Sequence, residues 1–373
     1  MRSRSAPDHA ALELLYDLFF VAAIVVLTFG YSHDPTIANL AWITLVFTLI
    51  WVVWVATSLV LNILGSDSAL IRALVIAQIL LLIAAVTAAD GVYSHTLATG
   101  PLCSATLLGL AGIYWEAQRI RPEFKSFSTP RIWACVLAAP VFAFPFYSDS
   151  LYLVFWLLGL VILISPALRP HPFDSLGIDT KKLAERLGIF TAIVLGESFV
   201  KIALTATDSK LDGLVLECLL ATLVIVLSIW WLYFTNISQD GESTGRTTHR
   251  FWILAHLPLH FGITGIAVAA TMVILPEVSH NADGNSTWTL VLSVAIVLVA
   301  LAVLKLIANE PNSRLAGAVF LAAAAVALGI GLISASQDYF DSRLAMIFMA
   351  CLMFVTVLSD YLLRTSPKAT VTR

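Results

Sequence analysis

The stretch LAERLGIFTAIVLGESFVKIA, from Leu183 to Ala203, decides the fold class of this chain. A membrane-spanning helix needs about 20 mostly apolar residues, and this stretch has that length and that character. It nevertheless carries Glu185 and Arg186 near one end and Glu197 and Lys201 further inside. A charge in the hydrocarbon costs on the order of 2.5–3.5 kcal/mol, so these side chains need partners or a function. We therefore predict a membrane-spanning helix whose charged side chains either pair with other side chains or take part in the function.

The composition of the whole chain also indicates a membrane protein. Its 373 residues are 59% hydrophobic and 12% charged, with a mean hydropathy of +0.91, whereas a soluble domain is roughly 45–50% apolar and about 25% charged. The net charge of -3 and the lack of a basic run exclude nucleic acid as a partner and leave the lipid bilayer. The four cysteines are scattered through apolar segments and are predicted to be buried, without disulfides.

Twelve windows are long and apolar enough to span a membrane, or nearly so. They predict an all-α integral membrane protein with about twelve transmembrane helices. The fifth and sixth windows are the weakest, because prolines interrupt the fifth and only a short polar turn separates the two; a re-entrant pair is the alternative. The windows are 12–31, 38–63, 70–90, 96–118, 129–148, 151–168, 183–205, 212–236, 250–275, 287–308, 314–335 and 342–364.

The positive charges predict the orientation of the chain. If the N-terminus is cytoplasmic, 18 of the 21 Lys and Arg residues fall on the inner side, and only Lys201, Lys210 and Arg343 fall on or towards the outer side. Positive charge collects in the cytoplasmic loops of membrane proteins. We therefore expect a multi-pass protein of the inner (plasma) membrane with both termini cytoplasmic.

An internal repeat is predicted at an offset of roughly 172 to 179 residues. Six helices per unit is an even number, so both units would have the same direction in the membrane, as two parallel six-helix repeats with a site between them. The expected division is 1–168, a cytoplasmic linker at 169–182, and 183–373; chance similarity among Leu-rich helices is the alternative. The matched stretches are ELLYDLFFVAA (13–23) with ERLGIFTAIVL (185–195), WVVWVATSLVLN (51–62) with SIWWLYFTN (228–236), and RALVIAQ (72–78) with RFWILAH (250–256).

Carboxylates and guanidinium groups are predicted to meet near the cytoplasmic helix ends. Glu13, Asp17 and Glu185 lie close to the starts of their windows, where a carboxylate also interacts with the positive end of the helix dipole. Arg72 and Arg250 begin the third and ninth windows at a similar depth. We expect ion pairs that set the architecture, and contact with a substrate is the alternative.

Other titratable residues lie deeper in the membrane. Glu197 is about 18 Å beyond Glu185 along the helix, and Lys201 follows one turn later on the same face. His256 and His260 share a face of the ninth window. Because chains of Asp, Glu and His carry protons through transporters, these residues predict a substrate- or proton-binding site, and hydrogen-bonded helix contacts are the alternative. The predicted site residues are Glu197, Lys201, His256, His260, Arg72, Arg250 and Gln78.

Two local signals have simpler explanations. Pro258, between the two histidines, is predicted to kink its helix. HLPLH lacks the glutamate of a zinc-protease helix and no acidic cluster flanks the histidines, so neither a metal nor a cofactor is expected.

An aromatic belt at the cytoplasmic interface is expected from Trp51, Trp54, Trp230, Trp231 and Tyr233.

Four stretches resemble the bacterial low temperature requirement A family, LtrA. They are ELLYDLFFVAAI, AERLGIFTAIVLGESFV, WWLYF and AHLPLHFGI, in family order, and the likeness runs from about residue 8 to 365. Two segments depart from the family pattern: Gly177 to Lys182 has no histidine, and Asn62 to Asp67 has few polar residues. The resemblance implies a polytopic bacterial membrane protein with paired halves, and it places weight on Glu13, Asp17, Glu185, Arg186, Glu197, Arg250, His256 and Pro258.

The sequence leaves different functions open. The first is a secondary transporter or a proton- or ion-coupled translocator, which the helix count, the repeat and the buried titratable groups favour. The second is an intramembrane enzyme that acts on a lipid or isoprenoid-like substrate at the cytoplasmic leaflet, with Glu13, Asp17 or Glu185 as acid or base. A structural or stress-protective role is the third. The substrate class (small molecule, lipid or ion) and the choice between a monomer and a homo-oligomer also stay open.

Overall fold

The chain is described here from a computed structural model. Within the residues that it describes, the chain forms twelve α-helices and two short 3-10 helices, and it forms no strand. This confirms the all-helical prediction, and the number of helices equals the number of predicted windows. The described residues are 6–65, 68–89, 96–143, 149–168, 178–208, 213–237, 248–274, 282–308, 312–336 and 341–365.

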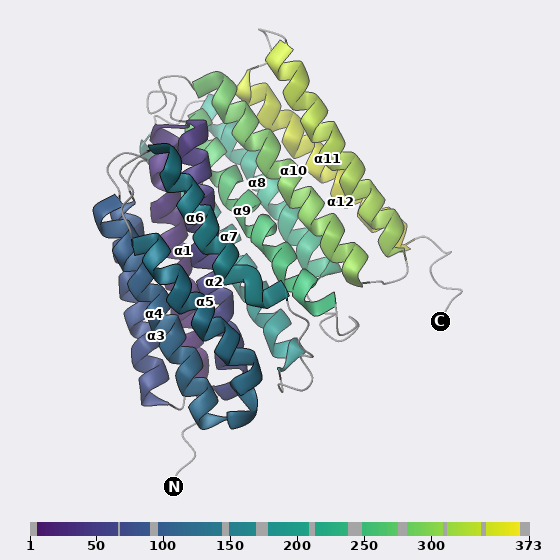
Figure 1. Cartoon of the computed structure of the whole chain (residues 1–373). Helices are drawn as coiled ribbons and strands as arrows, with labels where there is room; N and C mark the ends of the chain where they lie inside the picture. Colours follow the sequence, from purple (N-terminus) through teal and green to yellow (C-terminus); the bar gives the residue numbers. More distant parts are fainter. Residues whose placement is uncertain are drawn as a thin grey trace. The chain divides into compact units, whose positions relative to one another are not determined.

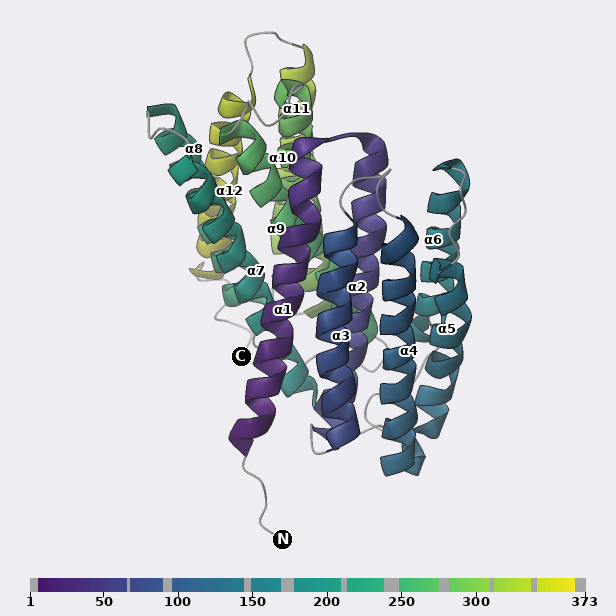
Figure 2. The same ribbon diagram turned by 90° about the vertical axis from the view of Figure 1, so that its left-hand side faces the viewer.

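The chain divides into two compact units, Met1–Leu183 and Ala184–Arg373. In the first unit α4 packs against α3 and α5, α1 packs against α2 and α3, and α6 packs against α5 and α2 (Figures 1 and 2). The 3-10 helices η1 (Pro122–Phe124) and η2 (Ser165–Leu168) precede α5 and follow α6. The helices of this unit are α1 (Ala6–His33), α2 (Ile37–Leu64), α3 (Ala69–Ala88), α4 (Thr96–Ile120), α5 (Lys125–Ala143) and α6 (Asp149–Ile164).

The second unit begins inside α7, whose first turn belongs to the first unit. Here α10 packs against α9 and α11, and α12 packs against α11 and α8 (Figure 1). The expected linker at 169–182 lies outside the described residues as far as residue 177, and α7 takes up its last three residues. The helices are α7 (Thr180–Asp208), α8 (Gly213–Asn236), α9 (Thr248–Ile274), α10 (Ala282–Ala308), α11 (Ser313–Ser336) and α12 (Ser342–Thr365).

Local sequence explains where helices begin and end. The Thr36 side chain accepts a hydrogen bond from the Asn39 amide at 3.2 Å and caps the start of α2. That helix ends at Gly65, whose φ of 67° is a left-handed value that glycine adopts readily. Ser68 caps the start of α3 in the same way as Thr36. The predicted window ends at 90, 148, 212 and 275 lie outside the described residues.

Within the described residues, ten helices are long and apolar enough to cross a membrane. The other two are α4, which carries Glu116 and Arg119 in its last turns, and α5, which contains Pro130 and Pro140. Of the two windows that we predicted to be weakest, the sixth therefore reaches the required length and hydropathy, whereas the fifth does not.

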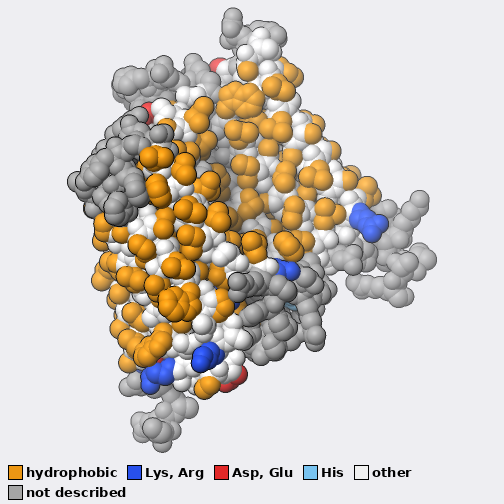
Figure 3. All heavy atoms as spheres, in the orientation of Figure 1, with side chains coloured by type: hydrophobic (Ala, Val, Ile, Leu, Met, Phe, Trp, Pro, Cys, Tyr) orange, Lys and Arg blue, Asp and Glu red, His pale blue; other side chains and the backbone are white. Residues whose placement is uncertain are grey.

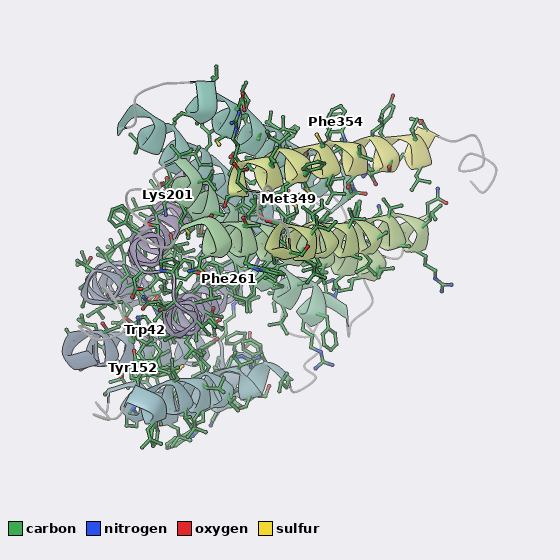
Figure 4. The ribbon with its side chains drawn as sticks, turned by 90° about the horizontal axis from the view of Figure 1, so that it is seen from above. Trp42, Tyr152, Lys201, Phe261, Met349 and Phe354 are labelled. Atoms are coloured by element: carbon green, nitrogen blue, oxygen red, sulfur yellow. The ribbon has the colours of Figure 1, made fainter. Side chains whose placement is uncertain are left out.

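The outward faces of the helices are apolar. On the face drawn in Figure 3, hydrophobic side chains cover most of the described surface. Figure 4 shows the contrast on α12, where Phe354 is 59% exposed while Met349 is buried. Soluble monomeric proteins rarely expose continuous apolar patches above a few hundred Å², so this surface requires a lipid bilayer.

The aromatic-belt prediction is wrong for three of its five residues. Trp51, Trp54 and Tyr233 are buried, at 1% exposure or less, whereas Trp230 and Trp231 are exposed. The reason is helical rotation, because neighbouring positions on a helix point in different directions and only some face a partner helix.

Aromatic packing also joins α2 and α6 of the first unit. The Trp42 ring of α2 lies 4.8 Å from the Tyr152 ring and 4.5 Å from the Trp156 ring of α6, between ring centroids (Figure 4).

Three of the four cysteines are buried as predicted, but Cys351 on α12 is exposed. That prediction is wrong because Cys351 lies on an outward face of its helix.

Candidate functional site

Four polar side chains of the second unit converge between three helices. Thr191 comes from α7, Tyr233 from α8, and His256 and His260 from α9. All four residues are 0% exposed. Polar groups buried this deeply need hydrogen-bond partners, and these residues find partners in one another.

The contacts form two hydrogen-bonded pairs. Tyr233 Oη lies 3.0 Å from His256 Nε2, and Thr191 Oγ1 lies 2.8 Å from His260 Nε2. The two imidazole rings are 5.8 Å apart between centroids. We call His256, Tyr233, Thr191 and His260 the histidine network.

The partners of His256 decide which nitrogen carries its proton. His256 Nδ1 lies 2.8 Å from the Trp252 carbonyl oxygen, which can only accept. In the neutral ring, Nδ1 therefore carries the proton and donates it to Trp252, while Nε2 accepts from the Tyr233 hydroxyl. The tautomer thus follows from the backbone of the same helix.

The Thr191 hydroxyl is the adjustable member of the histidine network. It donates to the Leu187 carbonyl oxygen at 2.8 Å and lies 2.8 Å from His260 Nε2. A hydroxyl has one proton, so it donates to one of these groups at a time and can turn from one to the other. If His256 gained a proton, both of its nitrogens would donate, and the Tyr233 hydroxyl would need another acceptor for its own proton.

Glu197 and Lys201 lie further along α7 and are half-buried (Lys201, Figure 4). Glu197 is close enough to act electrostatically on the Lys201 ammonium, in agreement with the predicted one-turn pairing. At about 100° per residue, Glu197 projects roughly 120° away from Thr191 around the helix. Thr191 and Phe190 are α7 side chains that contact His260.

The first unit holds a comparable polar cluster around Gln78 of α3, which is 0% exposed. Its Oε1 accepts hydrogen bonds from Tyr16 Oη at 3.0 Å and from Thr57 Oγ1 at 3.1 Å. Its Nε2 has no hydrogen-bond partner among the described residues. Beside this group, Trp54 Nε1 donates to Asp17 Oδ1 at 2.7 Å. Gln78 therefore keeps a donor that a bound acceptor could use.

The charged residues near the starts of α1, α3, α7 and α9 form a separate set from the histidine network. Glu13 Oε1 lies 3.0 Å from Lys182 Nζ, at the start of α7. Glu185 is exposed, while Arg72 and Arg250 are half-buried. The expected contact of Glu13 or Glu185 with one of these arginines stays a prediction.

Sequence reasoning found the two histidines and Gln78 but missed Thr191 and Tyr233. The only available signal for Tyr233 was its match with Trp54 in the proposed repeat. Across the described residues, no three His, Cys, Asp or Glu side chains are grouped so that they could hold a metal ion. α9 continues as a helix through Pro258, between the two histidines.

Comparisons with known proteins identify the family. The chain matches the family described as "Bacterial low temperature requirement A protein (LtrA)" over residues 10–358. It is also similar to an uncharacterised protein of Rhizobium meliloti (strain 1021), with 24% identity over 275 residues, which cover 69% of this chain and 67% of that protein. No solved structure matches it. Since the family match covers nearly the whole chain and confirms the resemblance of the four motifs, this multi-pass membrane protein belongs to the bacterial low temperature requirement A family.

Proposed function

We propose that this protein is a proton-coupled secondary transporter in which the histidine network carries the proton. The observation that supports this proposal is the pair of fully buried imidazoles on one membrane helix, which lie 5.8 Å apart between ring centroids and are each hydrogen-bonded to a hydroxyl. Chains of buried Asp, Glu and His side chains carry protons through pumps and transporters. Hydrogen-bonded contact between helices is the alternative role of these imidazoles, and the flux measurement below distinguishes the two.

The two units act in this proposal as parallel repeats. In each unit the fourth helix packs against the third and the fifth, the sixth against the fifth, and the second against the sixth. This shared pattern of neighbours supports the repeat that the matched stretches predict. Parallel repeats of six helices are an architecture that secondary transporters use.

Matched positions then suggest a division of labour. Gln78 corresponds to His256, and Trp54 corresponds to Tyr233. Gln78 cannot titrate, but its unpartnered Nε2 can donate a hydrogen bond to a substrate oxygen. We assign the substrate contact to Gln78 and the proton to the histidines. Glu197 and Lys201 would continue the proton path about 9–15 Å beyond Thr191 along α7.

The enzyme alternative has weaker support. Its proposed acids and bases include Glu13, which pairs with Lys182, and Asp17, which accepts from the Trp54 indole. These contacts suit carboxylates that join helices. A general acid or base must instead stay within reach of a substrate proton.

The test uses proteoliposomes with an imposed pH gradient and an internal pH-sensitive dye. His256→Gln keeps a hydrogen-bonding side chain of the kind found at position 78 but cannot titrate, so we expect it to fold and to lose most of the proton flux. His260→Gln and Glu197→Gln should reduce the flux as well. The matched control is Thr264→Val, which removes a hydroxyl bonded to the His260 backbone carbonyl and leaves the network contacts intact.

Two results would decide against the transport proposal. Unchanged flux in both His256→Gln and His260→Gln would show that the imidazoles do not carry the proton. A parent protein without flux for substrates of several chemical classes would favour the enzyme.

A further inference from the structure

A second buried polar cluster lies where α8 and α12 pack together at their C-terminal ends. Asn236 is the last residue of α8, and Asp360 lies in the last two turns of α12. Asn236 is 3% exposed and Asp360 is 1% exposed. Neither residue belongs to the histidine network or to the motifs that carry the family resemblance.

The donors of this cluster all reach the same oxygen of Asp360. Arg364 Nε lies 2.9 Å from Asp360 Oδ2, and Asn236 Nδ2 lies 3.1 Å from that atom. Asn236 Nδ2 also donates to the Leu232 carbonyl at 2.8 Å. The second oxygen of each of these two side chains, Asp360 Oδ1 and Asn236 Oδ1, is buried and has no hydrogen-bond partner among the described residues.

The unpartnered oxygens do not result from a reversed amide. Turning the Asn236 amide would bring its oxygen against the Leu232 carbonyl oxygen and Asp360 Oδ2, which are both acceptors. The amide oxygen therefore stays on the unpartnered side. Buried acceptors without a donor are rare and costly, so two of them in one cluster point to a bound positive group.

The negative helix ends and the oxygen ligands indicate which positive group could bind here. A helix C-terminus carries roughly −0.5 of an elementary charge, and two such ends meet here. Ligands that consist only of oxygens suit hard cations. A divalent ion would need more carboxylates than Asp360 alone, and Asp360 already shares its charge with Arg364. Protonation of Asp360 would weaken that ion pair, whereas a metal cation can bind Oδ1 and leave Oδ2 with Arg364.

We propose that Asp360 Oδ1 and Asn236 Oδ1 bind an alkali metal cation at the ends of α8 and α12. Tyr233 of the histidine network lies one turn before Asn236 on α8, so a cation bound here is next to the proposed proton path. The cation site does not depend on that path, because it rests on its own contacts.

The test measures cation binding by the purified full-length protein in detergent. Thermal unfolding is followed by tryptophan fluorescence at constant pH and ionic strength, while choline chloride is replaced stepwise by NaCl or KCl. We expect a saturable rise of the unfolding midpoint with at least one of the two cations. Binding of radioactive Na⁺ or of the K⁺ analogue Rb⁺ should reach one ion per chain and disappear in Asp360→Asn.

The matched control is Thr235→Val. It removes the hydroxyl that Arg364 contacts but keeps both unpartnered oxygens, so the cation response should persist. Asn236→Leu should lose the response and provides a second variant if Asp360→Asn does not fold. The proposal is wrong if neither cation raises the midpoint above that in choline, or if Asp360→Asn responds like the parent. A midpoint that depends on pH but not on Na⁺ or K⁺ would assign a proton to Asp360 and would also overturn it.

Discussion

The close contact of α9 with α10 gives the sharpest test of the packing. A Cβ at Gly262 would lie 2.7 Å from Val297 Cγ2 and 2.9 Å from the Ser293 carbonyl oxygen. The carbonyl belongs to the α10 backbone, so it cannot turn away as a flexible side chain can. Small residues at such positions let membrane helices approach closely. We therefore expect Gly262→Ala to destabilise the protein.

The size of the effect follows from comparison with a glycine in open space. A Cβ at Gly329 of α11 would meet nothing within 4 Å. Both substitutions gain the same helix propensity, roughly 0.5–1 kcal/mol, so the difference between the variants reports the overpacking, about 1–3 kcal/mol. For a unit of this size that is about 2–12 °C in the unfolding midpoint. Thermal unfolding in detergent measures it, and equal midpoints in Gly262→Ala and Gly329→Ala would refute the packing of α9 on α10.

Two further substitutions test polar contacts by the same assay. Trp54→Phe removes the indole donor of the buried Asp17 and should cost about 1–3 kcal/mol, with partial recovery when Asp17→Asn is added. Arg343→Ala breaks an ion pair with Glu217 whose side chains are both more than a third exposed, so it should cost less stability than Trp54→Phe, and less still in high salt. A larger loss in Arg343→Ala than in Trp54→Phe would contradict both assignments.

The helices could be predicted because the bilayer dictates their length. The predicted windows 38–63 and 342–364 correspond to α2 (Ile37–Leu64) and α12 (Ser342–Thr365). A span needs about 20 apolar residues, and a polar cap or a glycine limits it at each end. Apolar content alone is a weaker guide where proline occurs, as in α5, which falls short of the spanning criterion.

The site was only partly predictable, because its contacts depend on how each helix is rotated. His256 and His260 could be found, since four-residue spacing places them on one face of any helix. Thr191 and Tyr233 are common residues in apolar helices, and only the packing of α7, α8 and α9 shows that they meet the histidines. Asp360 did carry a signal, a single carboxylate in an apolar helix, but its partner Asn236 is 124 residues away in the chain.

The Gln78 cluster of the first unit and the histidine network of the second unit differ in whether they can take up a proton. This difference would affect how the protein works. If Gln78 and His256 descend from one ancestral position, the two units now hold side chains of similar size at equivalent sites, and only the histidine can take up a proton. A pair of glutamines would give two sites that ignore pH, and a pair of histidines would charge both units together. One of each lets a proton change the second unit while the hydrogen bonds of Gln78 to Tyr16 and Thr57 stay as they are. Under the proposed transport role, a proton drives a substrate only if it binds two conformations of the protein with different affinities, so the test is whether the state of His256 shifts that equilibrium.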